Sequence, residues 1–272
     1  MDAVTDNAPA LRTTSTLVTL PAGQVFVQRW QPEAAPQGGA ACPIVLLHES
    51  LGSVGQWRDF PVRLAQATGR EVLAYDRLGF GRSSVRSDAP SLQFIEQEAQ
   101  QHFPALMAAL GLPRYALLGH SVGGVMALQI AATHPAQCQA VLSLSAQAWV
   151  QPRTLEGIRA AQRFFADAQQ WARLQKWHGE RMDWVFRAWT DVWLHPDFAG
   201  WSLDNVLPRV TCPVLAIHGR RDEYGSTEFA QRIATGVARG EVLLLDCAHH
   251  PHREQTAQVL AAARDFLRRT LD

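Results

Sequence analysis

The sequence predicts an α/β domain, built as a doubly wound and mostly parallel sheet of eight strands with an inserted helical cap. One observation is a series of short apolar runs without polar alternation, a pattern typical of strands covered on both faces. These runs span 44–47, 72–75, 115–118, 140–144, 214–217 and 242–245. The other observation is that helical patterns lie between the runs, which is the alternation that a parallel sheet requires.

The remaining elements follow in chain order. Residues 17–30 predict an antiparallel pair that turns near 21–23 and adds two strands at the front edge of the sheet. Helices are expected over 57–68, 91–110, 121–133, 229–238 and 253–271. The second of these ends where Gly111 and then Pro113 follow, which is a usual helix stop.

One long segment breaks the alternation. The stretch between the runs 140–144 and 214–217 is far longer than a crossover needs, and it contains no convincing strand. Seven of the nine tryptophans lie between Trp149 and Trp201, and 155–194 indicates two or three helices. We therefore divide the chain into a core of residues 1–147 and 206–272 and a tryptophan-rich helical cap of residues 148–205.

Composition narrows the class of protein. With 272 residues, 47% hydrophobic and 18% charged, the chain is long and apolar enough to bury a core, which excludes disorder. Its 25 basic and 25 acidic side chains give zero net charge, which argues against nucleic acid or an anionic membrane as partner. The first sixteen residues are polar, so no signal peptide is expected and a cytoplasmic location is favoured. The four cysteines lack metal-binding spacing and are expected to be reduced thiols.

The most informative motif is Gly119-His120-Ser121-Val122-Gly123, which matches G-x-S-x-G. It follows the apolar run 115–118 and opens the predicted helix 121–133, and this strand–turn–helix placement gives the short pattern its specificity. The tight turn needs small residues on both sides of the serine and exposes the Ser121 hydroxyl at the carboxyl edge of the sheet. A serine that only caps a helix is the alternative, which the flanking strand disfavours.

A serine nucleophile needs a base, and the base needs a carboxylate to orient it. In this architecture both are expected at later strand ends, with the carboxylate first. The run 214–217 leads into His218-Gly219-Arg220-Arg221-Asp222-Glu223, and the run 242–245 leads into Asp246-Cys247-Ala248-His249-His250-Pro251-His252. All three elements project from one edge of the sheet, where open α/β sheets place their sites.

These segments make the chain resemble the α/β-hydrolase superfamily, in particular its capped serine hydrolases of the esterase and C–C hydrolase type. Two further segments carry the resemblance. The family's His-Gly segment is similar to Leu47-His48-Glu49-Ser50-Leu51-Gly52. The family's D-x-R-G-x-G-x-S loop is similar to Asp76-Arg77-Leu78-Gly79-Phe80-Gly81-Arg82-Ser83. The resemblance implies that Ser121 is the nucleophile, Asp222 the acid and His249 the base. It also implies an oxyanion hole formed by the backbone N–H groups of Val122 and Ser50.

The chain departs from the family pattern at two positions. Glu49 replaces the glycine that usually follows the histidine, and a glutamate does not easily adopt a positive φ, so Leu51 stays open as an alternative to Ser50. Ala248 replaces the usual glycine before the histidine. Among the catalytic assignments, Glu223 is an alternative to Asp222, and His250 is the main alternative to His249.

Other polar residues near these motifs are expected to be structural. His120 is the variable residue of the elbow, and Asp76 and Arg77 are expected to fix their loop. His252 is expected to support the site or to pack against the last helix. The histidines at 249, 250 and 252 can be read as a metal cluster, but with the serine and the aspartate already placed we expect no metal site.

The resemblance implies acyl transfer to water without a cofactor, and an ester or a thioester is the simplest substrate. C–C cleavage is less favoured, because His249 is not followed by the tryptophan that such hydrolases share. A hydroxynitrile-lyase reaction and a non-catalytic small-molecule receptor stay open. We expect a small apolar or aromatic substrate and, as tentative pocket residues, His48, Trp149, Trp184 and Trp189. A homodimer stays open.

Overall fold

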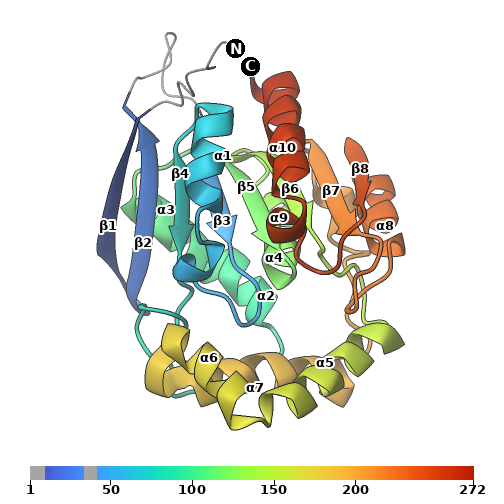
Figure 1. Ribbon diagram of the computed structural model, residues 1–272. Helices are drawn as coiled ribbons and strands as arrows, with labels where there is room; N and C mark the ends of the chain where they lie inside the picture. Colours follow the sequence, from blue (N-terminus) through green and yellow to red (C-terminus); the bar gives the residue numbers. More distant parts are fainter. Residues whose placement is uncertain (1–9, 34–41) are drawn as a thin grey trace, which may run out of the picture.

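The protein folds around one eight-stranded sheet (Figure 1), in a computed structural model that describes residues 10–33 and 42–272. The strand order is β1-β2-β4-β3-β5-β6-β7-β8. Strands β1 and β2 are antiparallel to each other, β2 is antiparallel to β4, and every other neighbouring pair is parallel. This is the mostly parallel eight-stranded sheet that the sequence predicts.

The strands coincide closely with the predicted runs. Their bounds are β1 Leu11–Leu20, β2 Gly23–Pro32, β3 Ile44–Leu47, β4 Val72–Tyr75, β5 Tyr115–His120, β6 Cys138–Leu144, β7 Val214–Gly219 and β8 Gly240–Leu245. Strands β3, β4, β5 and β7 are buried along their whole length, because helices cover both faces of the sheet. Strand β8 forms the far edge, and its first three residues are exposed.

Helices form a layer on each face. Their bounds are α1 Phe60–Thr68, α2 Phe94–Gln97, α3 Phe103–Ala109, α4 Val122–Thr133, α5 Pro152–Phe165, α6 Ala168–His178, α7 Met182–Trp193, α8 Glu228–Gly236, α9 Pro251–Glu254 and α10 Thr256–Leu271. Helices α1 and α10 pack together on one face, where Phe60, Leu64 and Phe266 enter the core. Helices α2, α3, α4 and α8 bury the other face, with Phe103 and Phe229 among their side chains.

Three details differ from the expectation. The edge hairpin is longer, since β1 begins at Leu11 instead of residue 17 and is exposed over most of its length. The helix expected over 91–110 is divided into α2, a π-helical turn at Glu98–His102 and α3. Pro104 lies in the first turn of α3 and has no N–H to donate, and such a residue is a usual cause of an interrupted helix. Helix α1 starts three residues late, after a 3-10 turn at Val54–Trp57.

Helices α5, α6 and α7 lie as a separate layer across one end of the sheet (Figure 1). The segment leaves and rejoins the core at neighbouring points, which are joined by an isolated antiparallel bridge between Trp149 and Ser202. The Leu203 N–H donates to the Ala148 carbonyl at 2.7 Å, and the Val150 N–H donates to the Trp201 carbonyl at 3.3 Å. We call these paired residues the stem of the cap. Among the described residues, no helix is long and apolar enough to cross a membrane.

Candidate active site

Ser121 occupies a strained turn between β5 and α4. Its backbone has φ 54° and ψ −125°, a conformation that costs a non-glycine residue free energy and is kept only where surrounding structure enforces it. The Ser121 N–H donates to the Leu144 carbonyl at 2.8 Å, and the Gly124 N–H donates to the Ser121 carbonyl at 2.8 Å. These bonds hold the serine at the carboxyl end of the sheet, with only 7% of its surface exposed.

The glycines around Ser121 are required by close backbone contacts. A Cβ at Gly119 would lie 2.1 Å from the Gly123 carbonyl oxygen, and a Cβ at Gly123 would lie 2.1 Å from the Leu47 carbonyl oxygen. No side chain fits at either distance, so strand β5, helix α4 and the end of β3 meet only because both positions are glycine. The spacing of the motif is therefore a packing requirement of the turn.

His249 and Asp222 form a buried pair at the ends of β8 and β7. The His249 Nδ1–H lies 2.8 Å from Asp222 Oδ2 and 2.9 Å from Oδ1. The Tyr224 N–H also donates to Oδ1, at 2.8 Å, and His218 Nε2 lies 3.3 Å from Oδ2. Asp222 is fully buried, so these donors replace the water that a carboxylate would otherwise need.

The two groups shift each other's protonation. Burial disfavours the ionised form of Asp222, but the charge and hydrogen bond of His249 outweigh it and lower the pKa of Asp222. Burial likewise disfavours protonated His249, but the Asp222 carboxylate outweighs it and raises the pKa of His249 above 6.5. An ionised carboxylate thus fixes the proton on Nδ1 and leaves Nε2 as a lone pair.

Ser121 and His249 border the same cavity, whose empty volume of about 810 Å³ includes space open to solvent. Within the described residues, neither Ser121 Oγ nor His249 Nε2 has a hydrogen-bond partner, so the serine and the histidine are not joined by a hydrogen bond here. In unliganded sites such bonds are often long and shorten only when substrate is bound. The structure brings the serine, the histidine and the aspartate of the sequence prediction to one place.

The Glu49–Ser50 peptide is held through its carbonyl group, which fixes the Ser50 N–H on the opposite side of the peptide. The Glu49 carbonyl accepts from the Arg77 guanidinium at 2.8 Å, from His48 Nδ1–H at 2.8 Å and from the Gly52 N–H at 3.1 Å. A trans peptide directs its N–H opposite to its C=O. Ser50 borders the serine cavity, and its N–H has no acceptor within the part of the chain that is described.

Two consequences follow for the predicted oxyanion segment. Glu49 is absent from the residues with positive φ among those described, so this path suits an L side chain and gives no reason to prefer Leu51 over Ser50. Val122 begins α4, where the first N–H groups of a helix have no partner within it. Ser50 and Val122 also border a second cavity, whose empty volume of about 540 Å³ includes space open to solvent.

The alternative acid and base lie in less suitable surroundings. Glu223 is exposed, and it makes no hydrogen bond to a described histidine. His250 borders the serine cavity, but burial lowers its pKa to about 4, and no described carboxylate is hydrogen-bonded to its ring. His252 packs between Trp57 and Phe60.

The loop-fixing residues make the contacts that their expected role requires. Asp76 accepts from the backbone N–H groups of Val54 at 2.5 Å and Arg82 at 2.8 Å. The Arg77 N–H donates to His48 Nε2 at 3.1 Å. A Cβ at Gly81 would lie 2.2 Å from the Asp76 carboxyl, so the loop closes tightly over that side chain. Asp76 and Arg77 therefore hold the loops after β3 and β4 in place.

Only part of the tentative pocket is found at the cavities. Trp189 borders the serine cavity, and Trp184 borders the second cavity, where its Nε1–H donates to the Asp88 carbonyl at 2.8 Å. Trp149 borders neither of these two cavities and packs edge-on against Phe229. His48 also borders neither of these two cavities, and both of its ring nitrogens are hydrogen-bonded, to the Glu49 carbonyl and the Arg77 N–H.

Several wall residues escaped the sequence prediction. Gln147, Tyr224 and Arg253 border the serine cavity. Gln147 Oε1 is buried without a described hydrogen-bond partner. Their positions in the sequence could have identified two of them, because Gln147 follows the end of β6 and Tyr224 lies two residues after Asp222.

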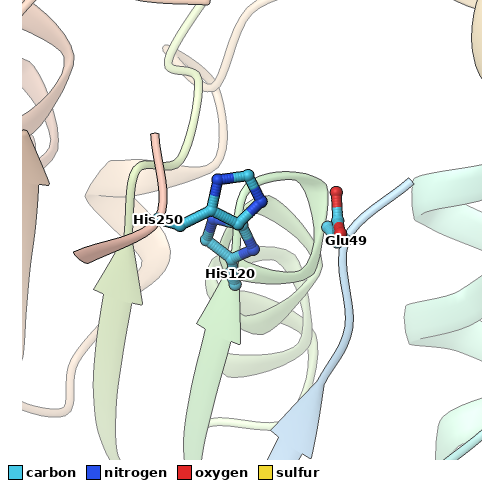
Figure 2. A group of neighbouring side chains, drawn as sticks. All are labelled: Glu49, His120 and His250. Carbon is cyan, nitrogen blue, oxygen red and sulfur yellow. The ribbon is translucent and has the colours of Figure 1, made fainter. Parts of the chain in front are cut away.

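A compact group of histidines surrounds the elbow. The His120 ring lies 5.0 Å from the ring of His249, 4.9 Å from that of His250 and 4.7 Å from that of His252, between centroids. Figure 2 shows His120 and His250 beside Glu49, and one ligand-capable atom from each of these three residues lies within 4.8 Å of the others. Within residues 10–33 and 42–272, they form the group whose side chains could together hold a metal ion.

Comparisons with known proteins agree with this arrangement. A family model for the alpha/beta hydrolase fold matches residues 43–254. The chain is 25% identical over 255 residues to a 2-hydroxymuconate semialdehyde hydrolase of Pseudomonas sp. (strain CF600), covering 84% of this chain and 88% of that protein. It is 30% identical over 240 residues to the serine hydrolase BPHL of Homo sapiens, covering 82% and 78%. A proline iminopeptidase structure from Mycobacterium smegmatis superposes with a TM-score of 0.75 at 24% identity, covering 94% and 98%.

Proposed function

The chain belongs to the alpha/beta hydrolase fold family, and on this premise we propose that it is a serine hydrolase that cleaves a carboxylic ester or thioester. The observation that carries the proposal is the buried His249–Asp222 pair, which shares a cavity with a serine on a strained strand–helix turn. A receptor that only binds a ligand has no use for this costly combination of strain and buried charge.

In the proposed acylation step, Ser121 Oγ attacks the carbonyl carbon and His249 Nε2 takes the hydroxyl proton. Asp222 stays ionised and stabilises the imidazolium that forms. The negative charge on the carbonyl oxygen is met by the N–H groups of Ser50 and Val122, and one such donor typically contributes about 10²–10³ in kcat. The tetrahedral intermediate collapses when His249 gives its proton to the leaving group.

Deacylation repeats the sequence with water as the nucleophile. His249 removes a proton from a water molecule that attacks the acyl carbon, the oxyanion donors act again, and the proton returns to Ser121 Oγ as the acid leaves. Arg77 has a positioning role in both steps, because it fixes the Glu49 carbonyl and thereby the direction of the Ser50 N–H.

The two cavities favour a substrate with a group on each side of the scissile carbonyl. The cap closes the serine cavity with apolar side chains, among them Ile158, Phe165 and Trp189. Phe80, Phe94 and Trp184 border the second cavity beyond Ser50 and Val122. We therefore propose a small apolar or aromatic substrate, in which the acyl part and the leaving group occupy different cavities.

The test is turnover of aryl and alkyl esters and thioesters of graded acyl size, with Ser121→Ala beside the wild-type protein. We expect turnover that the substitution abolishes, and an active-site phosphonate that adds its mass to the peptide containing Ser121. Ser226→Ala, a serine outside both cavities, is the matched control. Failure of both turnover and labelling in the wild-type protein refutes the proposal.

C–C bond hydrolysis is the second candidate, and the similarity to the 2-hydroxymuconate semialdehyde hydrolase favours it. The same serine, histidine and oxyanion donors would serve that reaction. Loss of the conjugated absorbance of 2-hydroxymuconate semialdehyde on incubation, with phosphonate labelling but little ester turnover, would establish it over the ester reaction.

A further inference from the structure

Three side chains near Ser121 have no part in the proposed reaction, and two of them, Glu49 and His250, border the serine cavity. Glu49 follows β3, His120 ends β5 and His250 follows β8, so three separate strand ends bring them together. In Figure 2, a ring nitrogen of each histidine is turned toward the Glu49 carboxylate. We propose that Glu49, His120 and His250 bind a divalent transition-metal ion such as Zn²⁺, and that the bound ion inhibits the enzyme.

His120 is held in the form that a metal ligand requires. Its Nε2 lies 2.8 Å from the His249 carbonyl oxygen, which can only accept, so Nε2 carries the proton. Burial and the neighbouring histidines lower the pKa of His120 well below 6.5, so the ring is neutral near pH 7 and Nδ1 is a free lone pair. Histidine ligands of metals commonly donate their other N–H to a backbone carbonyl in this way.

The backbones of the other two residues are fixed as well. Glu254 accepts from the His250 N–H at 3.1 Å and from the Ala248 N–H at 2.8 Å, which anchors the loop after β8. The Glu49 carbonyl accepts a hydrogen bond from Arg77. The side chains of Glu49 and His250 are only half-buried and can still rotate. Burial keeps His250 neutral, since its pKa is lowered to about 4.

The charges around the group are compatible with a cation. Glu49 supplies one negative charge, and Arg253 is the cation that shares its cavity wall. The Nη2–H group of Arg253 donates to the Gln56 carbonyl at 3.0 Å, so this part of the guanidinium is already engaged in a hydrogen bond. Burial lowers the pKa of the neighbouring His252, so its ring adds no positive charge near pH 7.

The distances require only a small contraction. Nitrogen and oxygen ligands lie about 2.0–2.2 Å from Zn²⁺, which places tetrahedral ligands about 3.4 Å apart. The three ligand atoms now lie within 4.8 Å of one another, so side-chain rotations of Glu49 and His250 bring them into range. Three protein ligands leave a fourth position for water.

Inhibition follows from the location and rests on the proposed hydrolase function. The His249 ring lies 5.0 Å from the His120 ring and 5.4 Å from the His250 ring, between centroids. A bound dication would therefore place positive charge beside the imidazolium that forms in the reaction and oppose the transfer of the serine proton. It would also occupy the cavity wall next to Ser121.

The test measures binding first, so that it does not depend on the reaction. Metal-free protein is titrated with Co²⁺ at pH 7.5 and followed by visible absorption, and Zn²⁺ affinity is measured by competition with a chromophoric chelator. We expect one ion per chain. Glu49→Gln and His250→Gln should each weaken binding at least about 10-fold, since even residues that only support ligands contribute about 10–100-fold. His195→Gln, at an exposed histidine beside Asp197, is the matched control and should leave affinity unchanged.

The activity arm compares turnover of the best ester with and without Zn²⁺ within each variant. Inhibition should track binding, so it should be lost at low Zn²⁺ in Glu49→Gln and kept in His195→Gln. Absence of stoichiometric binding by the wild-type protein overturns the proposal, and this result needs no variant to fold. Binding that survives both substitutions but is lost in His249→Ala would place the ion on the catalytic histidine and would overturn it too. If no substrate is turned over, the binding arm still decides the metal site.

Discussion

Replacing Asp222 by asparagine should abolish most of the activity while leaving the fold intact. The reason lies in the donors around the carboxylate. Oδ1 accepts the Tyr224 N–H at 2.8 Å, so the asparagine carbonyl is expected at that position, with its NH₂ group at the place of Oδ2, 2.8 Å from His249 Nδ1. An NH₂ group donates and cannot accept, so at the position nearer to Nδ1 it favours the tautomer in which His249 carries its proton on Nε2. In that tautomer the ring cannot take the proton of Ser121.

The expected magnitude is a loss of about 10⁴-fold in kcat, as for the equivalent change in other serine hydrolases, which corresponds to about 5.4 kcal/mol of transition-state stabilisation. The assay is ester turnover by wild type, Asp222→Asn and Glu223→Gln. Glu223→Gln removes the exposed neighbouring carboxylate and is the matched control, for which we expect less than a tenfold change. The circular dichroism of all three proteins should agree. More than a tenth of wild-type turnover in Asp222→Asn, or a larger loss in Glu223→Gln, would refute the reasoning.

Three further predictions concern the same site. Because catalysis needs neutral His249 and its pKa is raised above 6.5, kcat/KM should fall as the pH drops, with a midpoint above pH 6.5; a midpoint below that value would contradict the assignment. Gly123→Ala should destabilise the protein by about 3 kcal/mol or more in urea unfolding, because its Cβ would meet the Leu47 carbonyl, whereas Gly200→Ala has open space and should not. Arg77→Met should lower kcat about 10²-fold with a smaller change in KM, since it frees the Glu49–Ser50 peptide; an equal rise in KM would indicate lost binding instead.

The sequence was sufficient to predict the sheet, because a strand covered on both faces must be apolar throughout. The same logic located Ser121, since only glycine on both sides permits the contacts of that turn. The start of β1 was missed for the converse reason. Its residues from Arg12 to Leu17 are exposed, so no apolar pattern marks them, and pairing with β2 alone makes them a strand.

The walls of the site were harder to predict because they depend on where side chains point across irregular segments. Trp149 and Trp189 belong to the same tryptophan-rich stretch, yet Trp149 packs against Phe229 and only Trp189 borders the serine cavity. The direction of the Ser50 N–H depends on Arg77, which lies 27 residues later in the chain (77 minus 50). Neither composition nor periodicity reports such long-range contacts.

The stem of the cap has a consequence for how this protein can change over evolutionary time. The two ends of the inserted segment are held together by the Trp149–Ser202 bridge and the Leu203–Ala148 hydrogen bond. The insertion is therefore attached to the core as a single closed loop. The entropic cost of such a loop grows only slowly with its length. Caps of different size and shape can therefore be exchanged at this junction while Ser121, Asp222 and His249 stay where the sheet holds them. A change in the inserted segment can therefore alter which substrates bind without moving the residues that carry out the reaction.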